Sequence, residues 1–478
     1  MHYHLIGIGG TAMASLAGLL RAAGHQVTGS DEGVYPPMSD QLRELGIRYA
    51  EEYHPVNVGV GASQGSRPDI VVVGNAISRG NPELEAVLDE GLRYTSAAAV
   101  VKEEFLRGRH SVSVAGTHGK TTTASITAWL MESAGLKPSF LIGGIVENFG
   151  ASFRLTDSPF FVIEADEYDT AYFDKGPKMW HYLPRTAIVN NIEFDHADIY
   201  RDEEAYRWAF ARFINLIPRN GTLVAGWDSP ISRELAPRAF SRIESFGITD
   251  GSGPYPHWSA LDVEFGEKAT RFTVVHGGKE WGRVETPLAG GFNVRNCLAA
   301  IAACEAVGAD RDGVREGLAS FRSVRRRMEV RGEVDGVTVI DDFAHHPTAV
   351  TETIGAVRQR YAGRRLVAIF EPRSYTAQRR EFQDAYRQAL SGADRVVLAG
   401  LFHPERYTAE TGMNPDELVA SITAGGVPAG YISDVGRIVS EVVGSLQGDE
   451  VILVMSNGGF GGIHQKLLDA IGERASTR

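Results

Sequence analysis

The chain has very little cysteine: only Cys297 and Cys304 occur among its 478 residues. The two thiols are spaced seven positions apart in a helical pattern, so we expect them to share one core-facing side of a helix instead of forming a disulfide bond or a metal site. A chain poor in cysteine and free of disulfides fits a reducing compartment. We therefore expect the protein to work in the cytoplasm.

Long apolar runs and excess positive charge are also missing. No apolar run reaches the length that a membrane-spanning helix requires, and the segment 1–4 lacks the basic residues that open a signal peptide. The formal net charge is −12, which disfavours non-specific binding to nucleic acid or anionic lipid. We expect no nucleic-acid partner and no membrane insertion, and an anionic substrate would need local basic pockets.

What the chain does have is a long alternation of strand and helix patterns. With 43% apolar and 23% charged residues it reads as a soluble globular protein, and 478 residues are too many for one ordinary core. The alternation predicts the α/β class with mostly parallel sheets. It falls into three blocks, which we predict to be domains: 1–108, 109–322 and 323–478. The main predicted strands are 3–8, 26–30, 70–74, 111–115, 160–164, 186–190, 337–341, 365–370, 395–399 and 451–455, and the main predicted helices are 11–23, 124–134, 294–307 and 311–320.

The most informative segment is 115–123, Ala-Gly-Thr-His-Gly-Lys-Thr-Thr-Thr, which we call the phosphate loop. It lies between a predicted strand and a predicted helix. Its glycines allow a tight turn that aims N–H groups at an anion, Lys120 can reach terminal phosphates, and the Thr121 hydroxyl can bind magnesium. The usual motif has another glycine where this chain has Val114, so the loop is a shortened variant. The alternative is a tight turn with an exposed lysine.

A second glycine motif, Gly7–Ala12, follows the first predicted strand and fits the G-x-G-x-x-G/A pattern. Ser30 and Asp31 end the next strand, where a dinucleotide-binding domain places an acid on a ribose. By itself the motif would suggest a dinucleotide oxidoreductase or only a structural turn. Beside a separate phosphate loop, it favours a different ligand.

Carboxylates gather after two central strands. The segment 164–169, Glu-Ala-Asp-Glu-Tyr-Asp, follows one strand, and the segment 190–198, which contains His196 between acids, follows the next. Strand ends present sites in a parallel sheet, and hard oxygen ligands suit magnesium. The alternative is a solvated acidic turn and a structural histidine.

The remaining polar candidates lie farther along the chain. Asn293 and Asn296 open an alanine-rich helix, where amides can contact the edge of adenine or Asn293 can simply cap the helix. His345 and His346 are adjacent, so they point apart and lack zinc-ligand spacing. Arg373 follows a strand and offers a bidentate partner to a carboxylate.

The motif Gly-Thr-His-Gly-Lys-Thr-Thr resembles the ATP-binding loop of the Mur ligases, and the resemblance extends along the whole chain, through the segments 164–169, 190–198, 290–296, 325–329, 341–347 and 456–464. It implies a Rossmann-like N-terminal domain that binds a UDP-sugar, a central P-loop ATPase-like domain and a Rossmann-like C-terminal domain that binds a peptide. Two features depart from the family: Phe292 replaces a histidine, and the segment 203–208 has no lysine in place of the carbamylated lysine of several relatives.

The resemblance also implies roles for individual residues. The catalytic set is Lys120, Glu164, His196 and Arg327. The ATP-binding set is Gly116, Thr117, His118, Gly119, Lys120, Thr121, Thr122, Asn293, Asn296, Arg327 and Asp342. The magnesium ligands are Thr121, Glu164 and His196. The UDP-sugar set is Gly9, Gly10, Thr11, Ser30, Asp31 and Asn75, and the peptide set is Arg373, Ser456, Asn457 and Gly458.

The implied function is an ATP- and Mg²⁺-dependent ligase that joins UDP-N-acetylmuramate to the murein tripeptide L-alanyl-γ-D-glutamyl-meso-diaminopimelate in peptidoglycan recycling. In this family the sugar carboxylate attacks ATP to give an acyl phosphate, which the amine then attacks. The Arg373 segment and the segment 456–464 favour the tripeptide over free L-alanine as the amine. The alternatives are the L-alanine-adding ligase of the same family and a non-catalytic, ATP-gated binding protein. The oligomeric state is left open.

Overall fold

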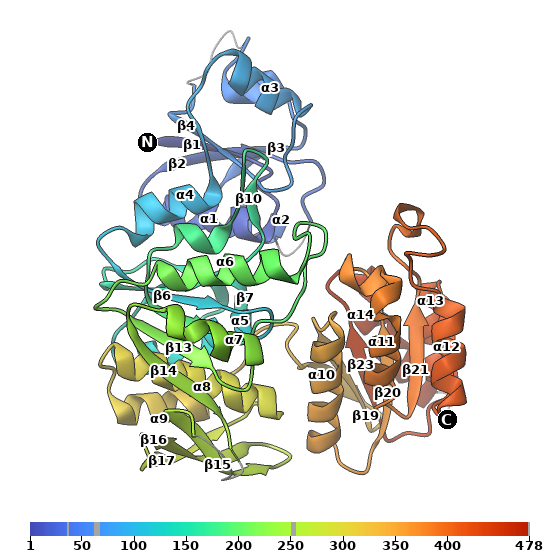
Figure 1. Ribbon diagram of the computed structural model, residues 1–478. Coiled ribbons are helices and arrows are strands. Elements are labelled where there is room, and N and C mark those ends of the chain that lie inside the picture. The colour runs from blue at the N-terminus through green and yellow to red at the C-terminus, as the bar shows by residue number, and fades with distance from the viewer. Residues whose placement is uncertain (36–37, 62–66, 250–254, 477–478) are drawn as a thin grey trace.

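The computed structural model describes residues 1–35, 38–61, 67–249 and 255–476. It confirms the α/β class: helices cover sheets that are mostly parallel. Figure 1 shows the N-terminal part stacked on the central part, with the C-terminal part beside the central one. Every helix among the described residues is too short or too polar to cross a bilayer.

The N-terminal sheet has five parallel strands in the order β3-β2-β1-β4-β5. Its strand β4, Ile-Val-Val-Val, is fully buried, as is typical of a strand in a parallel sheet that is covered on both faces. The strands are β1 (His2–Ile6), β2 (Gln26–Ser30), β3 (Arg48–Ala50), β4 (Ile70–Val73) and β5 (Tyr94–Ser96), and the helices are α1 (Thr11–Ala22), α2 (Met38–Glu44), α3 (Pro82–Asp89) and α4 (Ala97–Val100).

The central sheet has ten strands in the order β17-β16-β15-β14-β13-β12-β6-β9-β7-β8. Its strands are β6 (His110–Ala115), β7 (Ser139–Val146), β8 (Ala151–Arg154), β9 (Phe160–Glu164), β12 (Pro184–Val189), β13 (Thr222–Gly226), β14 (Arg242–Ile248), β15 (Trp258–Phe265), β16 (Thr270–His276) and β17 (Lys279–Thr286). The hairpin β10 (Asp169–Ala171) and β11 (Asp174–Pro177) stands apart from it. The helices are α5 (Lys120–Ser133), α6 (Glu203–Asn215), α7 (Pro230–Leu235), α8 (Gly291–Ala306) and α9 (Arg311–Ser320).

The C-terminal sheet has six strands in the order β18-β19-β23-β20-β21-β22, parallel except for β18. Its strands are β18 (Glu329–Val334), β19 (Val337–Asp342), β20 (Arg365–Phe370), β21 (Arg395–Ala399), β22 (Ala429–Ile432) and β23 (Glu450–Met455). Its helices are α10 (Pro347–Arg360), α11 (Gln383–Leu390), α12 (Pro415–Ala424), α13 (Val435–Gly444) and α14 (Ile463–Ser476). In Figure 1, α10 is the helix that faces the central part.

Several sequence-based element boundaries agree with the structure to the residue, including the strands 26–30, 160–164, 365–370 and 395–399 and the helix 311–320. The helix predicted at 124–134 begins earlier, at Lys120, because the polar end of the phosphate loop is already its first turn. Cys297 and Cys304 are free and fully buried in one core cluster on α8, as predicted.

Candidate active site

The phosphate loop connects β6 to α5 and depends on its two glycines. Gly116 has a φ of +138° and Gly119 a φ of +79°, and residues that carry a side chain rarely adopt these backbone conformations. A Cβ atom at Gly119 would lie 2.6 Å from Oδ1 of Asn296. The loop therefore needs glycine both for its turn and for its contact with α8, and it places the N-terminus of α5 where an anion would bind.

Lys120 is held inside the loop by a buried carboxylate. Its Nζ lies 2.8 Å from Oε2 of Glu167 and donates to the Gly116 carbonyl at 2.8 Å. Burial would lower the pKa of Lys120, but the surrounding carboxylates, Glu167 first among them, raise it. The ammonium group is therefore charged, and it must leave Glu167 to reach the terminal phosphates of a nucleotide.

A chain of hydrogen bonds joins the central and C-terminal parts at the loop. The Thr121 hydroxyl donates to Oε1 of Glu164 at 3.0 Å, and Nη2 of Arg327 donates to the Thr121 hydroxyl at 3.1 Å. Oε2 of Glu164 accepts the Gly143 N–H at 2.8 Å. Burial raises the pKa of Glu164, while Lys120 and Arg327 counteract part of that rise. The hydroxyl and carboxylate are hard donors, and their separation fits a shared magnesium ion.

His196 completes this charged cluster through Glu167. Its φ is +54°, which is uncommon outside glycine, and its Nε2 lies 3.2 Å from Oε1 of Glu167. Burial would lower the pKa of His196, but the hydrogen bond and charge of Glu167, together with the charge of Asp195, raise it to about 9. Glu167 therefore connects His196 to Lys120.

Sequence reasoning gave no role to Glu167 or to Tyr206. Glu167 is 0% exposed, and Lys120 and His196 lower its pKa against the effect of burial. The Tyr206 hydroxyl, from α6, lies 2.9 Å from Oγ1 of Thr117 and donates to Glu167 at 3.3 Å. Glu167 belongs to the acidic segment that the sequence singled out, but Tyr206 carried no signal, because a buried tyrosine on an amphipathic helix looks like ordinary core.

A cavity of about 630 Å³ lies between the central and C-terminal parts, and Lys120, Glu164 and Arg327 line it. The cavity collects most residues of the predicted ATP and magnesium sets: Thr117, His118, Gly119, Lys120, Thr121, Thr122, Glu164, His196, Asn293, Asn296, Arg327 and Asp342. They come from β6–α5, β9, the segment after β12, α8, the segment before β18 and β19. Of the predicted ATP set, only Gly116 is outside the lining.

The asparagines and Asp342 already have internal partners. Asn296 donates to Oδ1 of Asn293 at 3.1 Å, and Asn293 donates to the Ala289 carbonyl at 2.8 Å. The cap residue of α8 is Gly290, so Asn293 is not the N-cap that the sequence left open as an alternative. Asp342 accepts the N–H groups of Met328 and Ala344, both at 2.8 Å, and so orders the turn after β19.

The predicted UDP-sugar set lies apart from the cavity, in the N-terminal part. Gly10 and Thr11 are exposed at the turn between β1 and α1. Asp31 accepts the Gly9 N–H at 2.7 Å, so its carboxylate supports the turn directly. The Ser30 hydroxyl, by contrast, is fully buried and donates to Glu83 at 2.5 Å, so it faces the core.

Asn75 belongs to the same predicted set but contacts the central part. Its amide donates to Oδ1 of Asp169 at 2.9 Å and also to the Asp169 carbonyl. Asp169 begins the hairpin β10–β11. The geometry therefore gives Asn75 a role in joining two parts of the chain.

The predicted peptide set surrounds Arg373 at the ends of β20 and β23. The Arg373 guanidinium lies 3.9 Å from the centre of the Phe402 ring. Gly458 packs directly against it, since a Cβ at this position would come within 2.5 Å of the Arg373 side chain. Arg326 donates to the carbonyls of Ser456 at 2.6 Å and Gly458 at 2.7 Å and fixes this loop.

Asn457, the last member of the set, lies in the same loop, partly buried. Sequence reasoning missed Phe402 and Arg326, although Arg326 belongs to the segment 325–329 that carries part of the family resemblance.

Arg327 supplies a test of the junction between the two parts. Arg327→Lys keeps the charge but loses the planar fork, so we expect the turnover number to fall at least about tenfold with ATP affinity little changed, as when an interaction is made mainly in the transition state. Steady-state kinetics together with nucleotide titration measures both. The matched control is Arg325→Lys, because Arg325 is the exposed neighbour that pairs with Glu147. Equal losses in both variants would contradict the role of Arg327.

Family models match nearly all of the chain. The model "Mur ligase family, catalytic domain" matches residues 2–108, "Mur ligase middle domain" matches 114–304, and "Mur ligase, glutamate ligase domain" matches 326–458.

Individual relatives match over their full length. The chain is 43% identical to the UDP-N-acetylmuramate–L-alanyl-γ-D-glutamyl-meso-2,6-diaminoheptandioate ligase of Escherichia coli, with 100% of both chains covered. It is 33% identical to the UDP-N-acetylmuramate–L-alanine ligase of Chlorobium phaeobacteroides, covering 98% of this chain and 97% of the other. Among solved structures, a murein peptide ligase from Psychrobacter arcticus superposes with a TM-score of 0.72 at 36% identity, covering 99% of both chains.

Proposed function

The chain belongs to the Mur ligase family, and we propose that it is the ATP-dependent ligase that joins UDP-N-acetylmuramate to L-alanyl-γ-D-glutamyl-meso-diaminopimelate. The relative that carries this activity in its name is 43% identical over the full chain, whereas the L-alanine-adding relative is 33% identical. The product is a peptidoglycan precursor, so the reaction recycles cell-wall peptide in the cytoplasm and serves cell shape and division.

The observation that best supports the chemistry is the junction of Lys120, Glu164 and Arg327 in one cavity. Two cations and a carboxylate from the central part and from the segment before β18 meet at the N-terminus of α5, where phosphate binds best. Catalysis of phosphoryl transfer is mainly positioning and neutralisation of charge. The site therefore needs no side-chain nucleophile. The sugar carboxylate attacks the γ-phosphate and expels ADP, and the peptide amine then attacks the resulting acyl phosphate, forming the amide and expelling phosphate.

Each residue has a defined task in this account. Lys120 leaves Glu167 for the phosphates, and Arg327 turns from Thr121 toward the γ-phosphate, so both neutralise the charge that develops during transfer. Asn296 and Asn293 face the adenine and phosphates, and Asp342 faces the ribose. Thr121, Glu164 and His196 would hold magnesium, which would supply positive charge to neutralise the phosphates. His196 must lose its proton to act as a ligand.

The two other substrates occupy the outer parts. The turn at Gly9, Gly10 and Thr11 is suited to the diphosphate of the UDP-sugar, because it leads into the N-terminus of α1, where the first N–H groups of a helix attract an anion. The loop at 456–458 and Arg373 take the tripeptide. We propose that each domain binds one substrate: residues 1–108 the UDP-sugar, residues 109–322 ATP and residues 323–478 the peptide.

The direct test of this function is phosphate release measured with ATP and Mg²⁺, adding UDP-N-acetylmuramate and candidate amines in turn. A ligase of this kind releases phosphate steadily only when both the sugar nucleotide and an amine are present. Binding of ATP without phosphate release under any condition would favour the non-catalytic, ATP-gated binding protein. Release that does not depend on the amine would contradict the ligase.

The close contact between Gly458 and Arg373 predicts the effect of a single methyl group. Gly458→Ala should displace the guanidinium and raise the KM for tripeptide about tenfold or more, without changing the KM for ATP, because the added Cβ would lie 2.5 Å from Arg373. Gly459→Ala is the matched control, since a Cβ there meets nothing within 4 Å and its φ of −76° suits alanine. An unchanged tripeptide KM in Gly458→Ala would argue against Arg373 as a peptide contact.

A further inference from the structure

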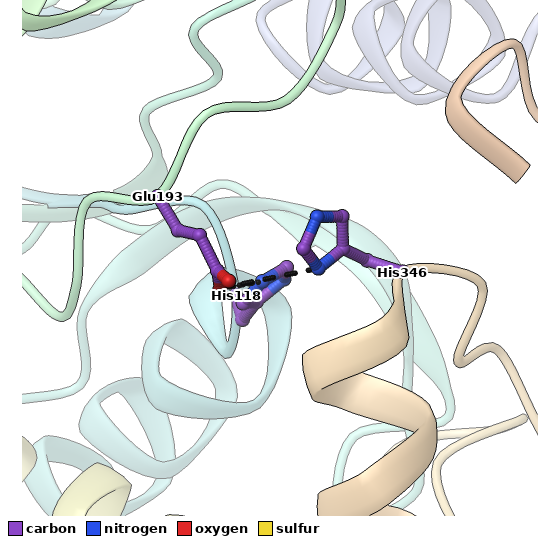
Figure 2. A group of neighbouring side chains, drawn as sticks. All are labelled: His118, Glu193 and His346. Carbon is purple, nitrogen blue, oxygen red and sulfur yellow. Dashed lines mark hydrogen bonds and ion pairs between the residues drawn. The ribbon is translucent and has the colours of Figure 1, made fainter. Parts of the chain in front are cut away.

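Three potential metal ligands from three separate elements meet beside the phosphate loop. His118 belongs to the loop, Glu193 to the segment after β12, and His346 directly precedes α10. Their nearest ligand atoms all lie within 4.8 Å of one another. Figure 2 shows the His346 ring reaching from the start of its helix toward His118 and Glu193. The cluster joins the central and C-terminal parts.

His346 is buried without the partners that a buried ring requires. It is 3% exposed, and within the described ranges neither ring nitrogen has a hydrogen-bond partner. Its Nδ1 lies 3.9 Å from Oε2 of Glu193, which is too long for a hydrogen bond. Buried polar atoms are nearly always satisfied, so an unsatisfied one needs an explanation such as an ion. Packing of aromatic rings explains the contacts of His346 with His118 and Phe382. It does not explain why both ring nitrogens lack a hydrogen-bond partner.

We propose that His118, Glu193 and His346 form a zinc site. Zinc binds imidazole and carboxylate at about 2.0–2.2 Å in a tetrahedron, which sets ligand atoms about 3.3 Å apart. Nε2 of His118 lies 3.1 Å from Oε2 of Glu193. The 3.9 Å between Nδ1 of His346 and the same oxygen shortens to a ligand spacing with a small shift of the His346 ring. The cluster is accessible to solvent on its Glu193 side, because that side chain is 43% exposed.

The donor set separates this site from the proposed magnesium site. Two nitrogen donors suit zinc and disfavour magnesium, which prefers oxygen. Burial lowers the pKa of His346 to about 4, so its imidazole is neutral and able to bind a metal at neutral pH.

The Glu193 carboxylate is oriented to bind the same ion. Its other oxygen, Oε1, accepts the Thr348 hydroxyl at 2.7 Å, leaving Oε2 to face the two rings. This is the outer-shell support that metal ligands commonly have. Because Thr348 and His346 both belong to the C-terminal part, an ion at this site would fix that part against the phosphate loop.

Titration with Zn²⁺ alone tests the site without reference to catalysis. The wild-type protein should bind one ion tightly, measured by calorimetry and by metal analysis after dialysis. Both His346→Gln and Glu193→Gln should weaken that binding at least about 100-fold, beyond the 10–100-fold cost of losing an outer-shell partner. Co²⁺ in place of Zn²⁺ should give the visible absorption of a tetrahedral centre in the wild type only.

The matched control is His181→Gln, which removes another half-buried histidine paired with an acid, Asp174. It should keep the tight site, and Zn²⁺ should raise the melting temperature of the wild type and of this control but not of the two site variants. If His346→Gln and Glu193→Gln bind Zn²⁺ as the wild type does, the site does not exist. If His181→Gln alone loses the ion, the site is elsewhere.

Discussion

Replacing Lys120 with alanine is expected to lower the rate of ligation at least about 100-fold, because a preorganised cation at a transferring phosphoryl group contributes several kcal/mol to the transition state. The structure places Lys120 in the phosphate loop with its Nζ 2.8 Å from Glu167. The measurement is the single-turnover rate of ligation at saturating substrates. The control is Lys466→Ala, which removes an exposed lysine from α14.

Lys120→Ala also leaves the buried Glu167 carboxylate with only His196 as a charged partner, and a buried charge that loses a partner destabilises a protein. The double variant Lys120→Ala/Glu167→Gln removes that charge. It should recover melting temperature relative to Lys120→Ala while remaining inactive. Ligation near the wild-type rate in either variant would overturn the assignment of the ATP site.

Replacing Arg373 with alanine should weaken the use of tripeptide about 100-fold in kcat/KM while leaving the binding of ATP and UDP-N-acetylmuramate nearly unchanged. An arginine paired with a substrate carboxylate is a strong, charge-assisted interaction, and its loss leaves the carboxylate unpaired. Arg373 lies over the Phe402 ring, at the ends of β20 and β23 and outside the ATP cavity. Its removal should therefore act on one substrate only.

Steady-state kinetics with each substrate varied in turn separates these effects. Arg379→Ala is a suitable control, because it removes a nearby arginine that pairs with Glu381 on the surface. If Arg373→Ala changes the KM for ATP as much as that for tripeptide, the residue acts through folding and not through the peptide.

The positions of the charged motifs were predictable because they follow strands. Glycine, lysine and carboxylate signals at the ends of β6, β9 and β12 must meet at one edge of a parallel sheet, and the structure brings Lys120, Glu164 and His196 into one cavity. Family resemblance added Arg327 and Asp342, which no local pattern connects to the phosphate loop.

Contacts between distant, individually ordinary residues were not predictable. The position of His346 beside His118 depends on how the C-terminal part docks, and the sequence shows only an adjacent pair of histidines that cannot share an ion. The antiparallel strands β15–β17 were also missing from the predicted elements, although the sequence does indicate them. Their signal was present, since the pair Gly277 and Gly278 forms a tight turn between alternating strands.

The choice of amine is the central claim, and one competition experiment tests it most directly. The enzyme receives ATP, Mg²⁺, UDP-N-acetylmuramate and equal concentrations of L-alanine and L-alanyl-γ-D-glutamyl-meso-diaminopimelate, and mass spectrometry measures the two products. The account predicts that the UDP-N-acetylmuramyl tripeptide predominates. Predominance of UDP-N-acetylmuramyl-L-alanine would contradict it and identify the chain as the L-alanine-adding ligase.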